Sequence, residues 1–474
     1  MLRSRAMKRR PSPRIFAAAL LAGVGALGLA NLDFDPSAAG LSLREAHAAA
    51  LASYSLPRIL ELADGNHPNI AMARSKVKQA RAQLDEAHWA PFSQFKLTGG
   101  VAIVPTLAGN NVYSPNTDVS LTSSLGVGWR AGIEGVVPLW TFGKISNLWE
   151  AADANVKLNE AMVERDRDAV RVDVRKAFFG LQLARDSQLV LKDVRSAIDK
   201  GQAALQKQID KDEGDPIDLL KLQTYASEID IRDAEVMRYV NVALAGLRFY
   251  TGVPDLDIGD EPIHPPRHQL GHITRYLQAA GLYRPEMAMV KAGINARQAQ
   301  VQLARAGLFP DIGVGLQIGV SAAPQIADQL NPYVVDPGNY FHYSAALVFQ
   351  WKLDFLPQTA KIRFAEAELD EIHAQQRFAL GGVAAEVELA YAEVVDWKKR
   401  VDIYARAVQT AKRWLVMVQA GIDVGTIADK ELLDPAKAYA LNRGNQLNAI
   451  MELDMAMSRL AKATGWDAIA PDGT

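Results

Sequence analysis

The sequence predicts a mainly α-helical chain with a β-barrel portion, in which each protomer contributes four β-strands and a set of long antiparallel α-helices. Three observations lead to this fold class. Apolar residues recur at intervals of three and four over long stretches, which is typical of amphipathic helices. Four shorter runs alternate strictly between apolar and polar or glycine residues, which indicates strands with one apolar face. The same order of elements occurs twice, which indicates a tandem duplication.

The N-terminus has the pattern of an export signal. A basic segment from Arg3 to Arg14 precedes an apolar run from Ile15 to Leu29, and Ala46-His47-Ala48 then offers a small-x-small cleavage motif. We therefore expect residues 1–48 to be a signal peptide. The alternative is an uncleaved anchor helix, for which the apolar run is short.

The composition excludes several classes of protein. The 474-residue chain has no cysteine, so it has no disulfide, no thiol nucleophile and no lipid-modified cysteine. Its formal net charge of −2 gives no reason to expect nucleic acid as a partner. No catalytic triad or nucleotide-binding loop is present, so we expect neither an enzyme nor a cofactor. His264, His268 and His272 are spaced by four, but Pro265 and Pro266 prevent the helix that would align them on a metal ion.

Residues at matching positions of the two halves repeat. Leu60, Pro68, Met72, Gln83 and Phe92 correspond at one constant offset to Leu277, Pro285, Met289, Gln300 and Phe309. Beyond the strands, Phe142, Val174 and Gly252 correspond in the same way to Phe355, Val387 and Gly465. We expect a first repeat at 49–252, an equatorial linker at 253–271, a second repeat at 272–465 and a C-terminal tail at 466–474. Four prolines in the linker predict an irregular collar there.

Each repeat is expected to contain one very long helix and two shorter ones. The first repeat has helices over about 56–90, 143–211 and 215–251, and the second over about 274–307, 359–420 and 428–464. A helix of about 70 residues is roughly 105 Å long, so two helices of half that length, placed end to end, match it. These lengths predict a helical shaft whose walls have the same length all round.

The strands are expected at about 93–104, 123–137, 311–321 and 341–354, two in each repeat. A tilted strand of about 10 residues spans the hydrocarbon core of a bilayer. Aromatic residues lie toward the strand ends, as in the aromatic girdle of a membrane protein: Trp129, Trp140, Phe341, Tyr343 and Trp351. The alternative is a soluble sheet with one face on a helical core. Since a membrane barrel needs at least about eight strands, a chain with four must oligomerise, and three copies supply twelve.

Several local motifs carry a resemblance to a known family. They are Asn66–Pro68 and Tyr283–Pro285 at helix openings, Val136–Leu139 at a strand exit, and Val424-Gly425-Thr426 followed by Leu432-Leu433-Asp434. With the duplication and the paired strands, the chain resembles the TolC family of outer-membrane efflux and secretion channels over essentially its whole mature length. The resemblance implies a homotrimeric channel-tunnel in the outer membrane of a Gram-negative bacterium, in contact with outer-membrane lipid and with a large periplasmic portion. It also implies two partners, a periplasmic adaptor (membrane fusion) protein and an inner-membrane pump of the RND, ABC or MFS type.

The resemblance also assigns roles to the turns between long and short helices. Gly214 and Asp215 in the first turn, and Gly425 and Thr426 in the second, are implied to dock the adaptor. Glu431 and Asp434 are implied to form a carboxylate ring at the tunnel entrance, which acts as a gate. The alternative is that these acids stabilise the first turn of a helix through its dipole.

Two other functions remain open from the sequence. A periplasmic coiled-coil adaptor, or a structural envelope protein without a pore, would also be rich in long helices. The transported substrate, the choice between efflux and secretion, and the resting state of the gate do not follow from the sequence.

Overall fold

The computed structural model describes residues 53–471 except 109–117, 213, 327, 329–335 and 337. The expected signal peptide therefore lies outside the described residues. All described elements belong to one compact unit, Leu51–Thr474. Among the described helices, none combines the length and the apolar character that a membrane span requires.

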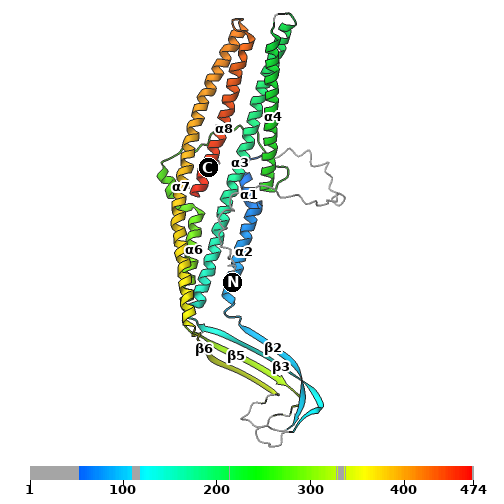
Figure 1. Cartoon of the computed structure of the whole chain (residues 1–474), viewed down its shortest axis with the longest axis vertical. Coiled ribbons are helices and arrows are strands. Elements are labelled where there is room, and N and C mark those ends of the chain that lie inside the picture. The colour runs from blue at the N-terminus through cyan, green and yellow to red at the C-terminus, as the bar shows by residue number, and fades with distance from the viewer. Residues whose placement is uncertain are drawn as a thin grey trace, which may run out of the picture. The chain divides into compact units, whose positions relative to one another are not determined.

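Eight α-helices are found in the described residues, four in each repeat. The first repeat contains α1 (Leu56–Asn66), α2 (Pro68–Trp89), α3 (Lys144–Ile209) and α4 (Pro216–Thr251). The second contains α5 (Ile273–Tyr283), α6 (Pro285–Ala306), α7 (Phe355–Asp423) and α8 (Leu433–Thr464), with a short 3₁₀ helix η2 (Asp429–Leu432) before α8. Helix α3 contacts α1, α2, α4, α6 and α8, so it joins the two repeats. Helices α4 and α7 lie at the two sides of this set (Figure 1).

The first helix of each repeat was predicted as one continuous helix, which is wrong. His67 and Arg284 have extended backbones, with ψ of 129° and 127°, and they separate α1 from α2 and α5 from α6. Each of them precedes a proline, and the proline ring excludes the helical conformation for the residue before it. The same break at matching positions supports the duplication.

At each break, a side chain forms a hydrogen bond with the C-terminal end of the last helix of the same repeat. Asn66 Nδ2 donates to the carbonyl of Thr251 at 2.8 Å, and Arg284 Nη1 donates to that of Ala463 at 3.2 Å. These bonds satisfy carbonyls that a helix C-terminus leaves without partners. Helices α4 and α8 then end at glycines with positive φ, Gly252 at 70° and Gly465 at 65°.

The apolar core is concentrated around the C-terminal half of α8, which packs against α7 and α3, and it includes residues of α1 and the linker. Leu447, Met457 and Leu460 of α8 are almost fully buried there. The linker forms a short parallel pair between β1 (Ser53–Tyr54) and β4 (Asp257–Ile258), which the sequence did not predict. Its apolar residues Leu256, Ile258 and Ile263 are buried in the same core, so the collar is anchored to the helices.

Two arginines of α3 in this region are paired with carboxylates. Arg171 of α3 contacts Asp64 at 2.6 Å and Asp467 at 2.9 Å, and Arg175 contacts Asp467 at 2.8 Å. Asp467 lies in the 3₁₀ helix η3 (Asp467–Ile469) after α8. A buried charge requires such partners because its desolvation is costly. These bridges attach both ends of the described chain to α3.

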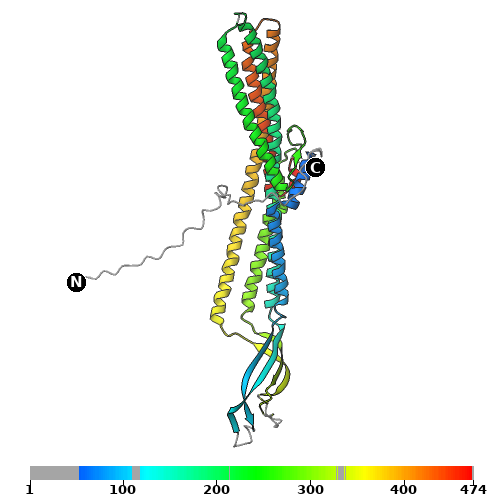
Figure 2. The ribbon, with the colours of Figure 1, turned by 90° about the vertical axis from the view of Figure 1, so that its right-hand side faces the viewer.

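The four remaining strands form one antiparallel sheet in the order β2-β3-β5-β6. They are β2 (Phe95–Ala108), β3 (Asp118–Trp140), β5 (Asp311–Ala322) and β6 (Tyr340–Gln350). Figures 1 and 2 show the sheet at one end of the helices and the α3–α4 and α7–α8 turns at the other.

Three strands, β2, β3 and β6, differ in their ends from the prediction. Strands β2 and β3 are longer because they continue to pair beyond a bulge at Pro105 and Thr106. Strand β6 ends at Gln350 instead of residue 354, because Gln350 pairs with Asp311, the first residue of β5. Residues 351–354 therefore have no strand beside them, and α7 begins at Phe355.

We expect Gly465→Ala to destabilise the protein more than Gly252→Ala. A left-handed alanine costs about 1–2 kcal/mol at either position. At Gly465 the added Cβ would also lie 2.6 Å from the carbonyl carbon and oxygen of Tyr283, whereas at Gly252 its nearest neighbour is Asn66 Cβ at 3.7 Å. Thermal unfolding followed by circular dichroism checks this. Equal losses in the two variants would contradict the close contact at Gly465.

Candidate functional site

All four strands of the sheet place their apolar residues on one face. Directly paired residues of antiparallel strands point to the same side. Val101 pairs with Trp129, Ala131 with Val320, and Ile318 with Tyr343. Each strand therefore adds its apolar half to a common surface.

This apolar face is exposed. Val101 and Leu347 each expose about three quarters of their surface, 75% and 73%, and no described helix covers them. The alternative of a soluble sheet packed on a helical core is therefore wrong. An exposed apolar face of this extent indicates contact with lipid or another protein.

The opposite face is polar and rich in glycine. One row across the four strands consists of Lys96, Glu134, Gln317 and Ser344, which are successive partners. Neighbouring positions on this face hold Arg130, His342 and several glycines. One apolar and one polar face are what a strand between lipid and an aqueous lumen requires.

The five aromatic residues predicted as a girdle lie at two levels of the sheet. Trp140 and Trp351 lie where the strands meet the helices, and Trp351 Nε1 donates to the carbonyl of Leu308 at 3.0 Å. Phe341 and Tyr343 lie near the start of β6, at the other end of the sheet, and Trp129 lies at a similar level of β3. All five are 45–77% exposed. Ten residues of strand separate Phe341 from Trp351, which is about 33 Å along a strand and about 25 Å across a bilayer after tilting.

At the other end of the molecule, the α3–α4 turn depends on close packing. A Cβ on Gly214 would lie 2.8 Å from the backbone nitrogen of Ile209, so only glycine fits. Asp215 caps α4, since its carboxylate accepts from the backbone N–H of Ile217 at 2.8 Å. Both residues therefore have a structural role in the turn.

The α7–α8 turn closes on the end of α7. The backbone N–H and the hydroxyl of Thr426 both donate to the carbonyl of Gly421, at 2.8 and 3.0 Å. Gly425 has a φ of 76°, which favours glycine, and a Cβ built on it has no neighbour within 4 Å. The surface at Gly425 is therefore open.

Both acids predicted at the gate are exposed near this turn. Glu431 lies in η2, and Asp434 lies in the first turn of α8. The turns of the two repeats are adjacent, since η2 contacts α3 and Lys437 Nζ of α8 lies 4.7 Å from the centre of the Tyr225 ring of α4. The position of Asp434 also suits the dipole of α8.

The three histidines of the linker have separate partners. His268 Nε2 lies 3.1 Å from the hydroxyl of Tyr276, and His272 Nδ1 accepts from the backbone N–H of Thr274 at 3.3 Å. Within the described residues, no group of three metal-ligating side chains occurs.

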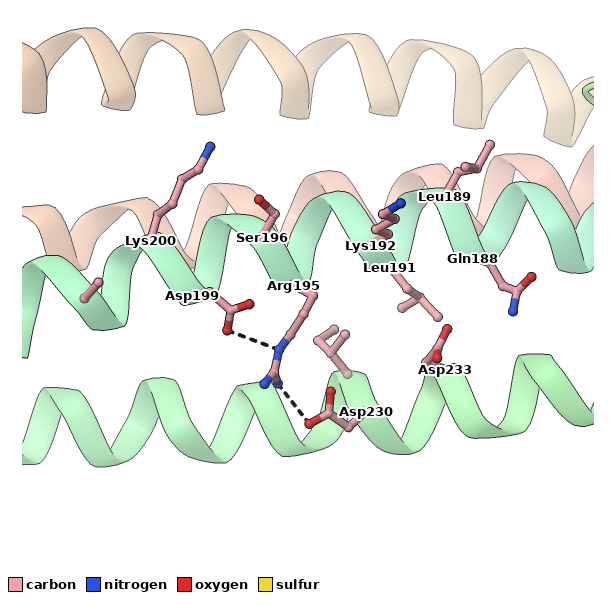
Figure 3. A pocket seen from close by; sticks show the side chains of 12 residues that line it. Gln188, Leu189, Leu191, Lys192, Arg195, Ser196, Asp199, Lys200, Asp230 and Asp233 are labelled. Atoms are coloured by element: carbon pink, nitrogen blue, oxygen red, sulfur yellow. Dashed lines mark hydrogen bonds and ion pairs between the residues drawn. The ribbon is translucent and has the colours of Figure 1, made fainter.

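A groove of about 760 Å³ lies along α3 and α4 (Figure 3). Three of its charged residues form a bridge, since Arg195 contacts Asp199 at 3.2 Å and Asp230 at 3.0 Å. Lys192 and Lys200 point away from this bridge (Figure 3). The arrangement is that of paired charges on packed helices and includes no nucleophile with a base.

The chain belongs to the outer membrane efflux protein family, whose model matches residues 59–253 and 276–466. The two matched segments correspond to the two repeats. Members of this family are channels of the outer membrane and not enzymes.

Individual relatives agree with this assignment. The chain is 21% identical over 367 residues to the probable outer membrane lipoprotein SilC of Salmonella typhimurium, which covers 76% of this chain and 73% of SilC. It is 20% identical over 399 residues to the cation efflux system protein CusC of Escherichia coli, over 81% and 80% of the two chains. The crystal structure of the Campylobacter jejuni outer membrane channel CmeC has the same fold, with a TM-score of 0.69, 16% identity and coverage of 93% and 94%.

The chain is thus an outer-membrane efflux channel with a TolC-like fold. The periplasmic adaptor considered as an alternative does not fit this family.

We expect Leu347→Lys to reduce assembly in the outer membrane, whereas Ser344→Lys on the same strand is tolerated. Leu347 lies on the apolar face, and a lysine near the bilayer midplane costs about 2–4 kcal/mol. Ser344 lies on the polar face, where a lysine remains in water. The amount of folded protein in outer-membrane fractions checks this. Equal amounts of the two variants would contradict the assignment of the faces.

Proposed function

We propose that the protein is a homotrimer that forms the exit duct of a tripartite efflux pump or a type I secretion system. One observation carries the proposal. The sheet is open, with β2 and β6 as edge strands, and its apolar face is exposed. Unpaired backbone groups at an edge are not tolerated in lipid, so neighbouring copies must close the barrel.

Three copies are the smallest number that leaves a lumen. Two copies would give eight strands, and the interior of such a barrel is filled by side chains. Three copies give twelve strands and a wider barrel. Only the polar face, with Glu134 and Gln317, can line its lumen.

The helices support the same assembly. Helix α4 packs mainly on α3 and α1 of the first repeat, and α7 packs mainly on α8, α6 and α5 of the second. Each retains large apolar side chains on its exposed side, such as Val242 and Phe249 on α4 and Phe378 and Leu389 on α7. In a ring, α4 of one copy would face α7 of the next, so these residues would be covered.

A heat-modifiable trimer band from outer-membrane fractions tests this stoichiometry. A monomer that stays soluble after export would contradict it.

The tip carries the proposed gate and docking site. In a trimer, Glu431 and Asp434 would place six carboxylates around the entrance, which would attract cations and influence closure. The turns with Gly214, Asp215, Gly425 and Thr426 would meet the adaptor. The pump would select the cargo. Since the name of CusC connects that relative with cation efflux, both metal cations and drugs are suitable cargoes to test.

We expect the combined change Glu431→Ala and Asp434→Ala to raise single-channel conductance and reduce the preference for cations. Removing six carboxylates would weaken the attraction for cations at the entrance and the contacts that hold it closed. Glu228→Ala, an exposed acid in the middle of α4, is the control and should change neither property. Measurements in a planar bilayer check this. If only thermal stability falls, the two acids act through the helix dipole.

We expect Gly425→Asn to impair efflux without impairing assembly. Asparagine tolerates a left-handed backbone, and its side chain would extend into open space on the docking surface. Resistance to metal cations and drugs, in cells that depend on this duct, measures efflux. Gly444→Asn, in the interior of α8 and away from the tip, is the control. Normal resistance with Gly425→Asn would contradict adaptor contact at this turn.

A further inference from the structure

Asp454 is a buried acid that the duct does not use. It lies in the core half of α8, with 1% of its surface exposed, and both of its carboxyl oxygens lack a hydrogen-bond partner. An unsatisfied buried polar group costs about 1–3 kcal/mol. A protein retains such a group in its core only at a cost in stability. The residues around Asp454 indicate which interaction could offset this cost.

Burial raises the pKa of Asp454 to about 8. No charged neighbour contributes to this shift. The carboxyl group is therefore mostly protonated at pH 7, and a cation placed beside it would replace the proton.

Asp454 is one of the residues that line a cavity of about 290 Å³. Each of its carboxyl oxygens exposes less than 1 Å², so a ligand at the carboxylate requires that the side chain rotate toward the cavity. The inner wall is apolar and buried, and it includes Phe178, Phe179 and Leu56. The rim is exposed and carries Glu261 and His264 of the linker. The cavity thus has an acid at its base, aromatic walls and a second acid at its mouth.

The lining determines which ligand fits. No lysine or arginine lines the cavity, so two carboxyl groups would repel an anion. A metal ion prefers several oxygen or nitrogen donors, whereas the base offers only the Asp454 carboxylate. An organic cation satisfies both parts of the site, because its nitrogen can donate to the carboxylate and its apolar part can contact the aromatic rings.

We propose that this cavity binds a small organic ammonium ion, with the charged nitrogen at the Asp454 carboxylate and the apolar part against Phe178 and Phe179. The proposal does not depend on the duct, since the cavity lies within one protomer. Four segments of the chain build it: the start of α1, α3, the linker and α8. A bound ligand would therefore connect the linker to the core.

Binding should depend on pH. The ligand requires the ionised carboxylate, of which about half is present at pH 8 and about 1% at pH 6, so affinity should fall about 50-fold between pH 8 and pH 6. The other titratable groups that line the cavity are Tyr54 of β1, and Glu261 and His264 of the linker, while α3 contributes the uncharged Gln182. His264 at the rim is also titratable, so its contribution needs a separate variant.

The test is calorimetric titration of the purified full-length protein with benzylamine at pH 8 and pH 6, and with benzyl alcohol as the neutral analogue. We expect benzylamine to bind at pH 8 and to bind about 50-fold more weakly at pH 6. Benzyl alcohol should bind at neither pH. Equal binding of the amine and the alcohol, or equal affinity at the two pH values, would overturn the proposal.

Single substitutions identify the group that binds benzylamine. Asp454→Asn keeps the shape of the side chain and should abolish benzylamine binding at both pH values. Glu452→Gln, on the same helix but facing the groove between α3, α4 and α8, should leave it unchanged. His264→Gln should retain most of the pH dependence. Binding that survives Asp454→Asn would overturn the proposal, and if that variant does not fold, the comparison of amine and alcohol on the unaltered protein decides.

Discussion

Hydrogen bonding of the backbone in lipid is the constraint on which the rest of this structure depends. Each protomer brings four strands, of which β2 and β6 have one unpaired side. Water would satisfy these groups, but lipid does not. A sheet with an apolar outer face and two open edges is stable in the outer membrane only as part of a larger ring. The arrangement of the helices is consistent with this requirement, because α4 and α7 leave apolar side chains uncovered on the two sides of the protomer.

The duplication explains how one chain supplies both sides of such a unit. The two repeats share their breaks before proline, their helix ends at Gly252 and Gly465, and their insertion of two strands. The two repeats differ in how much of their last helix is buried. The C-terminal half of α8 is buried, and α8 packs against α7 and α3, whereas the equivalent part of α4 is largely exposed. The core is thus centred near the linker, and the turns with Gly214 and Gly425 lie far from it.

The sequence predicted the fold class because periodicity reports directly on which face of an element is buried. Alternation located all four strands, and helical spacing located the long helices. The breaks at His67 and Arg284 follow from Pro68 and Pro285, which the prediction underestimated. The pairing of Tyr54 with Ile258 could not be predicted, because two-residue strands have no periodicity. Asp454 was also missed, since a single acid in a helix gives no sign of burial. Its cavity depends on segments that are distant in the sequence.

The glycines on the polar face of the sheet have a consequence for the packing of that face. Gly132 and Gly319 are paired across β3 and β5, and Gly128 and Gly315 occupy the same face. A Cβ built on Gly319 would lie 2.5 Å from the ring of His342, and one built on Gly315 would lie 2.6 Å from the side chain of Val348. Side chains of β6 thus occupy the space that these glycines leave free. A larger residue at either glycine would displace its neighbour on β6.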